Sequence, residues 1–265
     1  MTTMVDIRLL GGFQVAVGGV AIPTDAWRRR HAAALVKLLA LAPGRTLHRE
    51  QVLDALWPDE DPALSAPRLH KAAHFVRRAT SQRDAVVLDG HHVSLFPAAV
   101  VQVDAVVFER LAVAGDLVAA IEVCGGDLLP ADPYEPWLDA ARLHLRRLRL
   151  DVLRAAGRWP ELLAVEPSDE EAHLAVMRAH LAAGRRAAVL QQFDRLRVAV
   201  DELGIEPGPD AVALRDLALD DGLLQDGEPA AFGPPRRSDG HRPRRRPSAR
   251  RCRIAGDLRA GRGHR

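Results

Sequence analysis

The sequence predicts an α+β domain at the N-terminus, an all-α helical region after it, and a disordered basic tail. Three observations support this division. Apolar residues alternate with other residues near the start of the chain, recur at helical spacing from Trp27 onward, and become sparse after Glu228. A chain of 265 residues is long enough for two modest domains, each with its own core.

The charge is divided in the same way. Basic and acidic side chains number 12 and 10 in residues 1–104, 13 and 22 in residues 105–227, and 12 and 3 in residues 228–265. The three segments therefore carry net charges of +2, −9 and +9. The first segment also holds six of the eleven histidines, whose pKa values would rise beside a polyanion.

The first predicted elements are short strands followed by two helices. Apolar residues alternate over residues 5–9 and 13–17, and glycine pairs interrupt them, which predicts strands joined by tight turns. A first helix is expected from Trp27 to Ala42, ahead of Pro43-Gly44. A second is expected over "LHREQVLDALWP", which ends at Pro58.

A third helix is predicted over residues 65–80, "SAPRLHKAAHFVRRAT", with Ser65 as its N-cap and Pro67 in its first turn. A helical wheel places its apolar residues in one sector, which should face the core: Leu69, Ala72, Ala73, Val76, Ala79 and Thr80. A neighbouring sector forms a basic stripe of His70, Lys71, His74, Arg77 and Arg78. No acidic residue occurs between Asp61 and Asp84.

A hairpin is expected next, because Asp89-Gly90 separates two β-rich runs in "AVVLDGHHVSLF". Strands, three helices and a hairpin follow one another in the order of a winged helix-turn-helix. A basic stripe is often only a solvated helix face. In a winged helix, however, the third helix enters the major groove of DNA, so its position favours DNA binding.

The chemistry of the side chains assigns their expected roles in DNA binding. Arg68 and Lys71 suit guanine O6 and N7, near the start of the helix. Arg77 and Arg78, near its end, suit phosphate. His70 and His74 suit either partner.

The helical region is expected to extend from Asp104 to about Leu224. Within it "LRAAGRWPELL" and "HLAAGRRAAVL" look like two copies of one helix-turn-helix unit, with Gly157 and Gly184 27 residues apart. Tetratricopeptide repeats have a period of about 34 residues, so one copy lacks about seven residues, or two helical turns. The segment from Glu228 onward, after the helical region, is rich in Pro, Gly and Arg and is predicted to be disordered.

The sequence contains no signature of catalysis. The P-loop, the G-x-G-x-x-G loop and the G-x-S-x-G elbow do not occur in it. "HKAAH" has the i, i+4 histidine spacing of a zinc helix but lacks the glutamate and a third ligand. We therefore expect no enzyme activity, no cofactor and no metal.

Two cysteines, Cys124 and Cys252, form no disulfide framework and fit a reducing cytosol. The start of the chain lacks the features of a signal peptide, and no apolar run approaches the length of a membrane span. A cytoplasmic protein without membrane contact is expected.

Several segments resemble one family. They are "IRLLGGFQV", "WRRRHAAALVKLLALAPGRTLHREQVLDALWP", "GGDLLPADPYEPWL", "PSDEEAHLAVMRAHLAAGRRAAVLQQFDRLRVAV" and "DELGIEPGPDAVALRDL". Together they are similar to the actinobacterial SARP-type regulators, which have an OmpR-type winged helix followed by a bacterial transcriptional activator domain (BTAD) of tetratricopeptide-like helices. The resemblance runs from Val5 to Leu219.

The resemblance implies three parts: a winged helix over residues 1–100, a BTAD over 104–224 and the tail over 225–265. It implies a sequence-specific activator of a secondary-metabolite or other specialised gene cluster, associated with the nucleoid. Such regulators bind direct repeats in double-stranded promoter DNA as side-by-side copies, in effect a homodimer on DNA, and contact RNA polymerase holoenzyme.

The same resemblance adds two candidate sites. The wing tip spans residues 89–93 and includes His91 and His92 as further DNA contacts. The loop "PDEDPALS" between the second and third helices resembles the polymerase-contacting loop, with the acids Asp59, Glu60 and Asp61.

Pro67-Arg68 stands where relatives commonly have a polar pair such as Asn-Asn, so the target sequence is not carried over from them. Many relatives continue into an ATPase domain where this chain has its arginine-rich tail, which leaves a truncated fragment of a larger regulator ATPase as one alternative. A helical-repeat protein-interaction module with a degenerate winged helix is another. Salt-dependent DNA binding would separate that second alternative from the activator.

Overall fold

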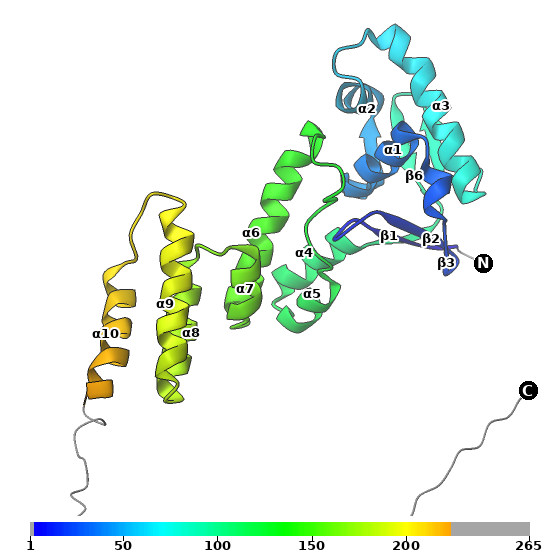
Figure 1. The fold of residues 1–265 in the computed structure, drawn as a ribbon. Helices are drawn as coiled ribbons and strands as arrows, with labels where there is room; N and C mark the ends of the chain where they lie inside the picture. Colours follow the sequence, from blue (N-terminus) through cyan, green and yellow to red (C-terminus); the bar gives the residue numbers. More distant parts are fainter. Residues whose placement is uncertain (1–2, 224–265) are drawn as a thin grey trace, which may run out of the picture. The chain divides into compact units, whose positions relative to one another are not determined.

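A computed structural model describes residues 3–223, which are mostly helical with two small sheets (Figure 1). The predicted disordered tail lies outside these residues. No helix in the described part of the chain has the length and apolar character needed to cross a membrane.

The first sheet has the strand order β3-β2-β1-β7. Its strands are β1 (Met4–Arg8), β2 (Gln14–Val17), β3 (Val20–Ala21) and β7 (Val100–Val103). β1 pairs antiparallel with β2 and parallel with β7, so that Ile7 faces Val15 on one side and Val103 on the other. Val5, Ile7 and Val15 are buried, which confirms the alternation expected from the sequence.

Three helices and a second sheet follow. The helices are α1 (Arg30–Leu41), α2 (Arg49–Leu56) and α3 (Pro62–Thr80). The sheet has the order β4-β6-β5, from β4 (Thr46–His48), β5 (Val86–Asp89) and β6 (His92–Leu95). The hairpin expected around Asp89-Gly90 is confirmed, since Asp89 pairs with His92. Residues 46–48, in contrast, form a strand where the sequence predicted the start of a helix.

The predicted start of α3 is wrong. The helix begins at Pro62 rather than at Ser65, and the backbone carbonyl of Asp61 accepts hydrogen bonds from the N–H groups of Leu64 and Ser65. Ser65 is buried, and its hydroxyl donates back to the Asp61 carbonyl at 3.2 Å instead of capping the helix. Pro67 therefore lies in the second turn, where a proline removes one hydrogen bond of the helix.

The helical region comprises seven α-helices between residues 104 and 223. They are α4 (Asp104–Ala114), α5 (Leu117–Val123), α6 (Asp139–Ala155), α7 (Trp159–Val165), α8 (Glu170–Ala182), α9 (Arg186–Asp201) and α10 (Pro209–Leu223). Gly157 and Gly184 adopt φ values of +65° and +68° at the α6–α7 and α8–α9 turns, a conformation that favours glycine. α7 has 7 residues where α9 has 16, so the shortfall expected from the repeat spacing falls in α7.

One hydrophobic core cluster joins the two sheets and the first three helices to α4, α5 and α6. A second cluster lies among α8, α9 and α10. At the junction of β7 and α4, the carboxylate of Asp104 accepts hydrogen bonds from the backbone N–H groups of Leu9 (2.8 Å), Leu10 (3.0 Å) and Ala105 (2.8 Å). Burial nevertheless raises the pKa of Asp104 above its usual range, because the charged form is desolvated.

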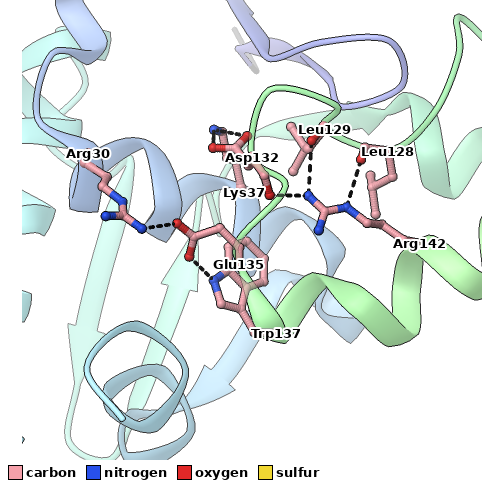
Figure 2. A network of polar contacts seen from close by, with 8 residues as sticks. All are labelled: Arg30, Lys37, Leu128, Leu129, Asp132, Glu135, Trp137 and Arg142. Atoms are coloured by element: carbon pink, nitrogen blue, oxygen red, sulfur yellow. Dashed lines mark hydrogen bonds and ion pairs between the residues drawn. The ribbon is translucent and has the colours of Figure 1, made fainter. Parts of the chain in front are cut away.

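Ion pairs fix the loop between α5 and α6 against α1 (Figure 2). The ammonium group of Lys37, which is 8% exposed, donates to both carboxylate oxygens of Asp132 at 2.9 and 2.7 Å. Arg30 donates to Glu135 at 2.6 Å, and Glu135 also accepts a hydrogen bond from the indole of Trp137 at 2.9 Å. The start of α1 is thus held by a segment more than 90 residues further along the chain.

Candidate nucleic-acid interface

The long helix α3 presents two faces. Leu69, Ala73 and Val76 are fully buried, which confirms the predicted core face. Five basic residues beside that face are exposed to solvent: Arg68, His70, Lys71, His74 and Arg78. Four of them, all but Arg68, belong to the basic stripe predicted from the sequence. The fifth member of that stripe, Arg77, is only partly exposed.

Arg77, which the sequence predicts to contact phosphate, makes hydrogen bonds within the protein. Its guanidinium donates Nε and Nη2 to the backbone carbonyl of Val86, at 2.9 and 2.7 Å. Val86 begins strand β5 and is fully buried, so this arginine satisfies a carbonyl that solvent does not reach. The arginine stem is long enough to bend from the stripe toward the neighbouring sheet, and the side chain is only partly exposed.

Arg68 is exposed but not free. Its guanidinium forms a hydrogen-bonded ion pair with the carboxylate of Glu60, in the loop between α2 and α3. The other carboxylate oxygen of Glu60 is buried and finds no donor in the described part of the chain. A candidate base-reading residue and a candidate polymerase-contacting acid are therefore in direct contact.

The loop that carries the three acids is shorter than predicted. "PALS" forms the first turn of α3, which leaves only residues 57–61 between the two helices. Asp59 is exposed, whereas Asp61 supplies the backbone carbonyl at which α3 begins. Glu60 is the half-buried member of the three.

Three imidazoles meet beside the predicted wing. The His48 ring stacks on the His91 ring with centroids 5.5 Å apart, and it meets the His92 ring edge-on at 5.7 Å. His48 also caps α2 by accepting a hydrogen bond from the Glu50 N–H, within a capping box completed by Gln51. Among residues 3–223, no group of histidine, cysteine, aspartate and glutamate has the arrangement of a metal site.

Sequence reasoning missed a second group of basic residues, at the start of α1. Together with residues of α3 they line a cavity of about 380 Å³ whose walls include Arg28, Arg29, His31, Trp57, Arg68 and Lys71. The run Arg28-Arg29-Arg30 is visible in the sequence as a charge cluster, but its proximity to α3 depends on tertiary packing. Burial, and then the positive charges of Arg30 and Arg68, lower the pKa of His31, which favours its neutral form.

Part of the chain matches a known protein family. Residues 93–217 match the family model described as the bacterial transcriptional activator domain. The matched segment begins in β6 and ends in α10. This part of the chain therefore resembles a domain of transcriptional activators.

Two curated relatives are regulatory proteins of Streptomyces. The chain is 26% identical over 237 residues to the regulatory protein AfsR of Streptomyces coelicolor, covering 76% of this chain and 24% of AfsR. It is 26% identical over 212 residues to AfsR of Streptomyces griseus, covering 70% and 22%. These matches confirm the resemblance to the SARP-type transcriptional regulators, although the chain spans only about a quarter of the length of these two relatives.

A solved structure shares the fold. EmbR of Mycobacterium tuberculosis, in complex with a low affinity phosphopeptide, superposes with a TM-score of 0.55 at 19% identity. The match covers 83% of this chain and 66% of the EmbR chain. At this level of identity the similarity concerns the arrangement of helices and strands alone.

Proposed function

We propose that the protein is a sequence-specific DNA-binding transcriptional regulator, an activator of a specialised gene cluster such as one for secondary metabolism. Residues 1–100 act as an OmpR-type winged helix, residues 104–224 as a tetratricopeptide-like BTAD, and residues 225–265 as a basic tail. The protein acts on promoter DNA in the cytoplasm, at the nucleoid. The match to the activator domain supports the regulatory role.

The observation that carries the proposal is the exposed basic side of α3. Lys71, His74 and Arg78 are solvent-exposed, and none of them pairs with a carboxylate within residues 3–223. A solvated helix usually mixes charges, because i, i+4 ion pairs add a few tenths of a kcal/mol each. The face of α3 instead suits a polyanion, and strand β5 of the hairpin contacts the same helix.

The roles of the individual residues follow from their exposure. Arg68 and Lys71 read base edges in the major groove, and His70 and His74 contact bases or backbone. Arg78 contacts phosphate, as do His91 and His92 in the wing. Arg77 holds α3 against strand β5 through its hydrogen bonds to the Val86 carbonyl.

The same proposal assigns the partners. The loop acids Asp59 and Glu60 contact RNA polymerase holoenzyme, and Asp61 holds the loop to the start of α3. Two copies bind side by side on direct repeats, as a homodimer formed on DNA, so that each α3 meets one half-site.

Salt dependence of DNA affinity tests this function. The full chain is titrated against a labelled duplex from the region upstream of its own gene and against an unrelated duplex, between about 50 and 200 mM salt. We expect affinity to fall linearly on log-log axes, with a slope of about −0.9 per phosphate contacted. Lys71→Ala should lose the preference for the upstream duplex, whereas Arg78→Gln should weaken both duplexes by the same factor.

Arg110→Gln, a charge change at an exposed site on α4, is the matched control and should behave as the wild type. Equal, negligible binding of both duplexes at low salt would overturn the proposal. If the protein then captured a protein partner, the helical-repeat interaction module would be the better account.

A further inference from the structure

The cavity between the start of α1 and the middle of α3 is built largely from cations. Arg28, Arg29 and Arg30 contribute from the α1 side, and Arg68 and Lys71 from α3. No acidic residue lines it. Because Arg68 and Lys71 also belong to the basic side of α3, the cavity opens beside the helix proposed to read bases.

Part of this positive charge is compensated elsewhere and part is not. Glu135 binds Arg30, which also lines the cavity, and Glu60 binds Arg68. Arg28 has only a distant contact with Asp25, at 3.8 Å between largely exposed side chains, and such pairs stabilise weakly.

Arg29 and Lys71 pair with no carboxylate in the described part of the chain. The Arg29 guanidinium lies over the Phe75 ring, 5.0 Å from its centroid. A contact with an aromatic ring orients this cation without neutralising it. In addition, α1 begins with no side-chain cap and no acidic residue in its first turn, so its N-terminal dipole is also uncompensated.

The aromatic wall of the cavity includes a donor without an acceptor. Trp57 is 5% exposed, and its indole Nε1–H is buried and makes no hydrogen bond within residues 3–223. Leaving a buried donor unpaired costs about 1–3 kcal/mol. The His31 ring stacks on this indole with centroids 5.0 Å apart. The two stacked rings of His31 and Trp57 thus form part of the cavity wall beside the cations.

We propose that this cavity binds a phosphate of the DNA backbone, with Arg28 and Arg29 as its principal contacts beside His31 and Trp57. The inference rests on the proposed DNA-binding function and adds a contact point that the basic stripe of α3 does not supply. A phosphate bound here sets the position of α3 along the duplex. Arg68 and Lys71 then meet base edges in a defined register.

A double variant, Arg28→Gln with Arg29→Gln, tests the proposal in the same titration of the full chain against the upstream and the unrelated duplex. Backbone contacts carry no sequence information, so both duplexes should lose affinity by the same factor. The salt slope should become shallower by about 1 for the phosphate lost. Arg110→Gln serves again as the matched control. A slope equal to that of the wild type, or a loss confined to the upstream duplex, would overturn the proposal.

The two proposals fail in distinguishable ways. If the wild-type chain binds neither duplex, the DNA-binding function itself is wrong. If the wild type binds with a salt-dependent slope that the double variant keeps, only the cavity is misassigned.

A second measurement needs no variant. The pKa of His31 is followed by NMR in the wild-type chain, alone, with the unrelated duplex, and with inorganic phosphate at the same phosphate concentration. A DNA phosphate in the cavity favours the imidazolium, so the pKa of His31 should rise with the duplex and stay unchanged with inorganic phosphate. An unchanged pKa with the duplex would contradict the proposal. An equal rise with inorganic phosphate would also contradict it, and would make the cavity a site for free anions.

Discussion

The carboxylate of Glu60, in the loop between α2 and α3, accepts a hydrogen bond from the guanidinium of Arg68 on α3. This contact joins the loop proposed to meet polymerase to a residue proposed to meet DNA. In the protein without DNA, the Arg68 side chain is 54% exposed yet already has a carboxylate partner. The base contact proposed for Arg68 therefore requires the ion pair with Glu60 to break.

Glu60→Gln should increase affinity for DNA, because it releases Arg68 from a charged partner. The pair is partly exposed, at 54% and 30% for the two side chains, so its strength should not exceed about 1 kcal/mol. The gain in affinity should stay below about fivefold, measured by fluorescence anisotropy at fixed salt. Asp59→Asn makes the same change of charge without breaking an ion pair to Arg68, and should have a smaller effect. Equal gains from both variants would show that only long-range charge matters.

Arg68→Ala should reduce discrimination between the protein's own site and unrelated DNA. Loss of a good bidentate contact to guanine costs about 1–3 kcal/mol at one base pair. Competition assays with duplexes substituted at single positions would locate that base pair. If Arg68→Ala weakened all duplexes by one common factor, Arg68 would be a backbone contact instead.

Arg77 and Arg78 should behave in opposite ways, although they are neighbours in the sequence. Arg77→Ala leaves the buried carbonyl of Val86 without its donors, and should lower the free energy of unfolding by about 1–3 kcal/mol while leaving the salt slope of DNA binding unchanged. Arg78→Ala should leave stability within about 0.5 kcal/mol of the wild type and make the salt slope shallower. Urea denaturation and DNA titration of both variants check the pair. A reversed pattern would mean that Arg77 is the phosphate contact, as the helical wheel alone suggests.

The contact between Glu135 and Arg30 should make stability depend on pH in acid. Burial alone would raise the pKa of Glu135, but hydrogen bonds from Arg30 and Trp137 outweigh it and lower that pKa below its usual range. A carboxylate with a lowered pKa in the folded state stabilises the fold above its ordinary pKa. That contribution is lost as the pH falls through the lowered value.

The measurement compares thermal unfolding of the wild type and Glu135→Gln. The wild type should be more stable at neutral pH, by less than about 1 kcal/mol because the Arg30 side chain is 75% exposed. The difference should disappear at a pH where Glu135 is protonated. A difference that persisted unchanged in acid would show that the ion pair contributes nothing and that the substitution acts by another route.

The sequence predicted the features that depend on local periodicity. The apolar face of α3 was correctly located, because Leu69, Ala73 and Val76 follow the helical repeat whatever their partners. The hairpin was also correct, but its two-residue turn is Gly90-His91 and not Asp89-Gly90, because Asp89 still belongs to β5 and pairs with His92.

Features that depend on long-range pairing were missed. β4 and β7 are strands of three and four residues that exist through pairing, Thr46 with Ser94 and Val100 with Met4, and such short runs have no periodicity of their own. The start of α3 was misplaced because serine is a common N-cap residue. The hydroxyl of Ser65 instead donates a hydrogen bond to the Asp61 carbonyl. The helical wheel placed Arg77 on the basic stripe, but the guanidinium at the end of its long side chain donates a hydrogen bond to the Val86 carbonyl.

DNase footprinting on DNA flanking the protein's own gene tests the central claim most directly. It is performed with the full chain and with Lys71→Ala. The account predicts a protected region containing direct repeats spaced by about one helical turn, roughly 10 base pairs, and loss of that protection in the variant. Uniform or absent protection by the wild type, at salt low enough for nonspecific binding, would contradict sequence-specific recognition by α3.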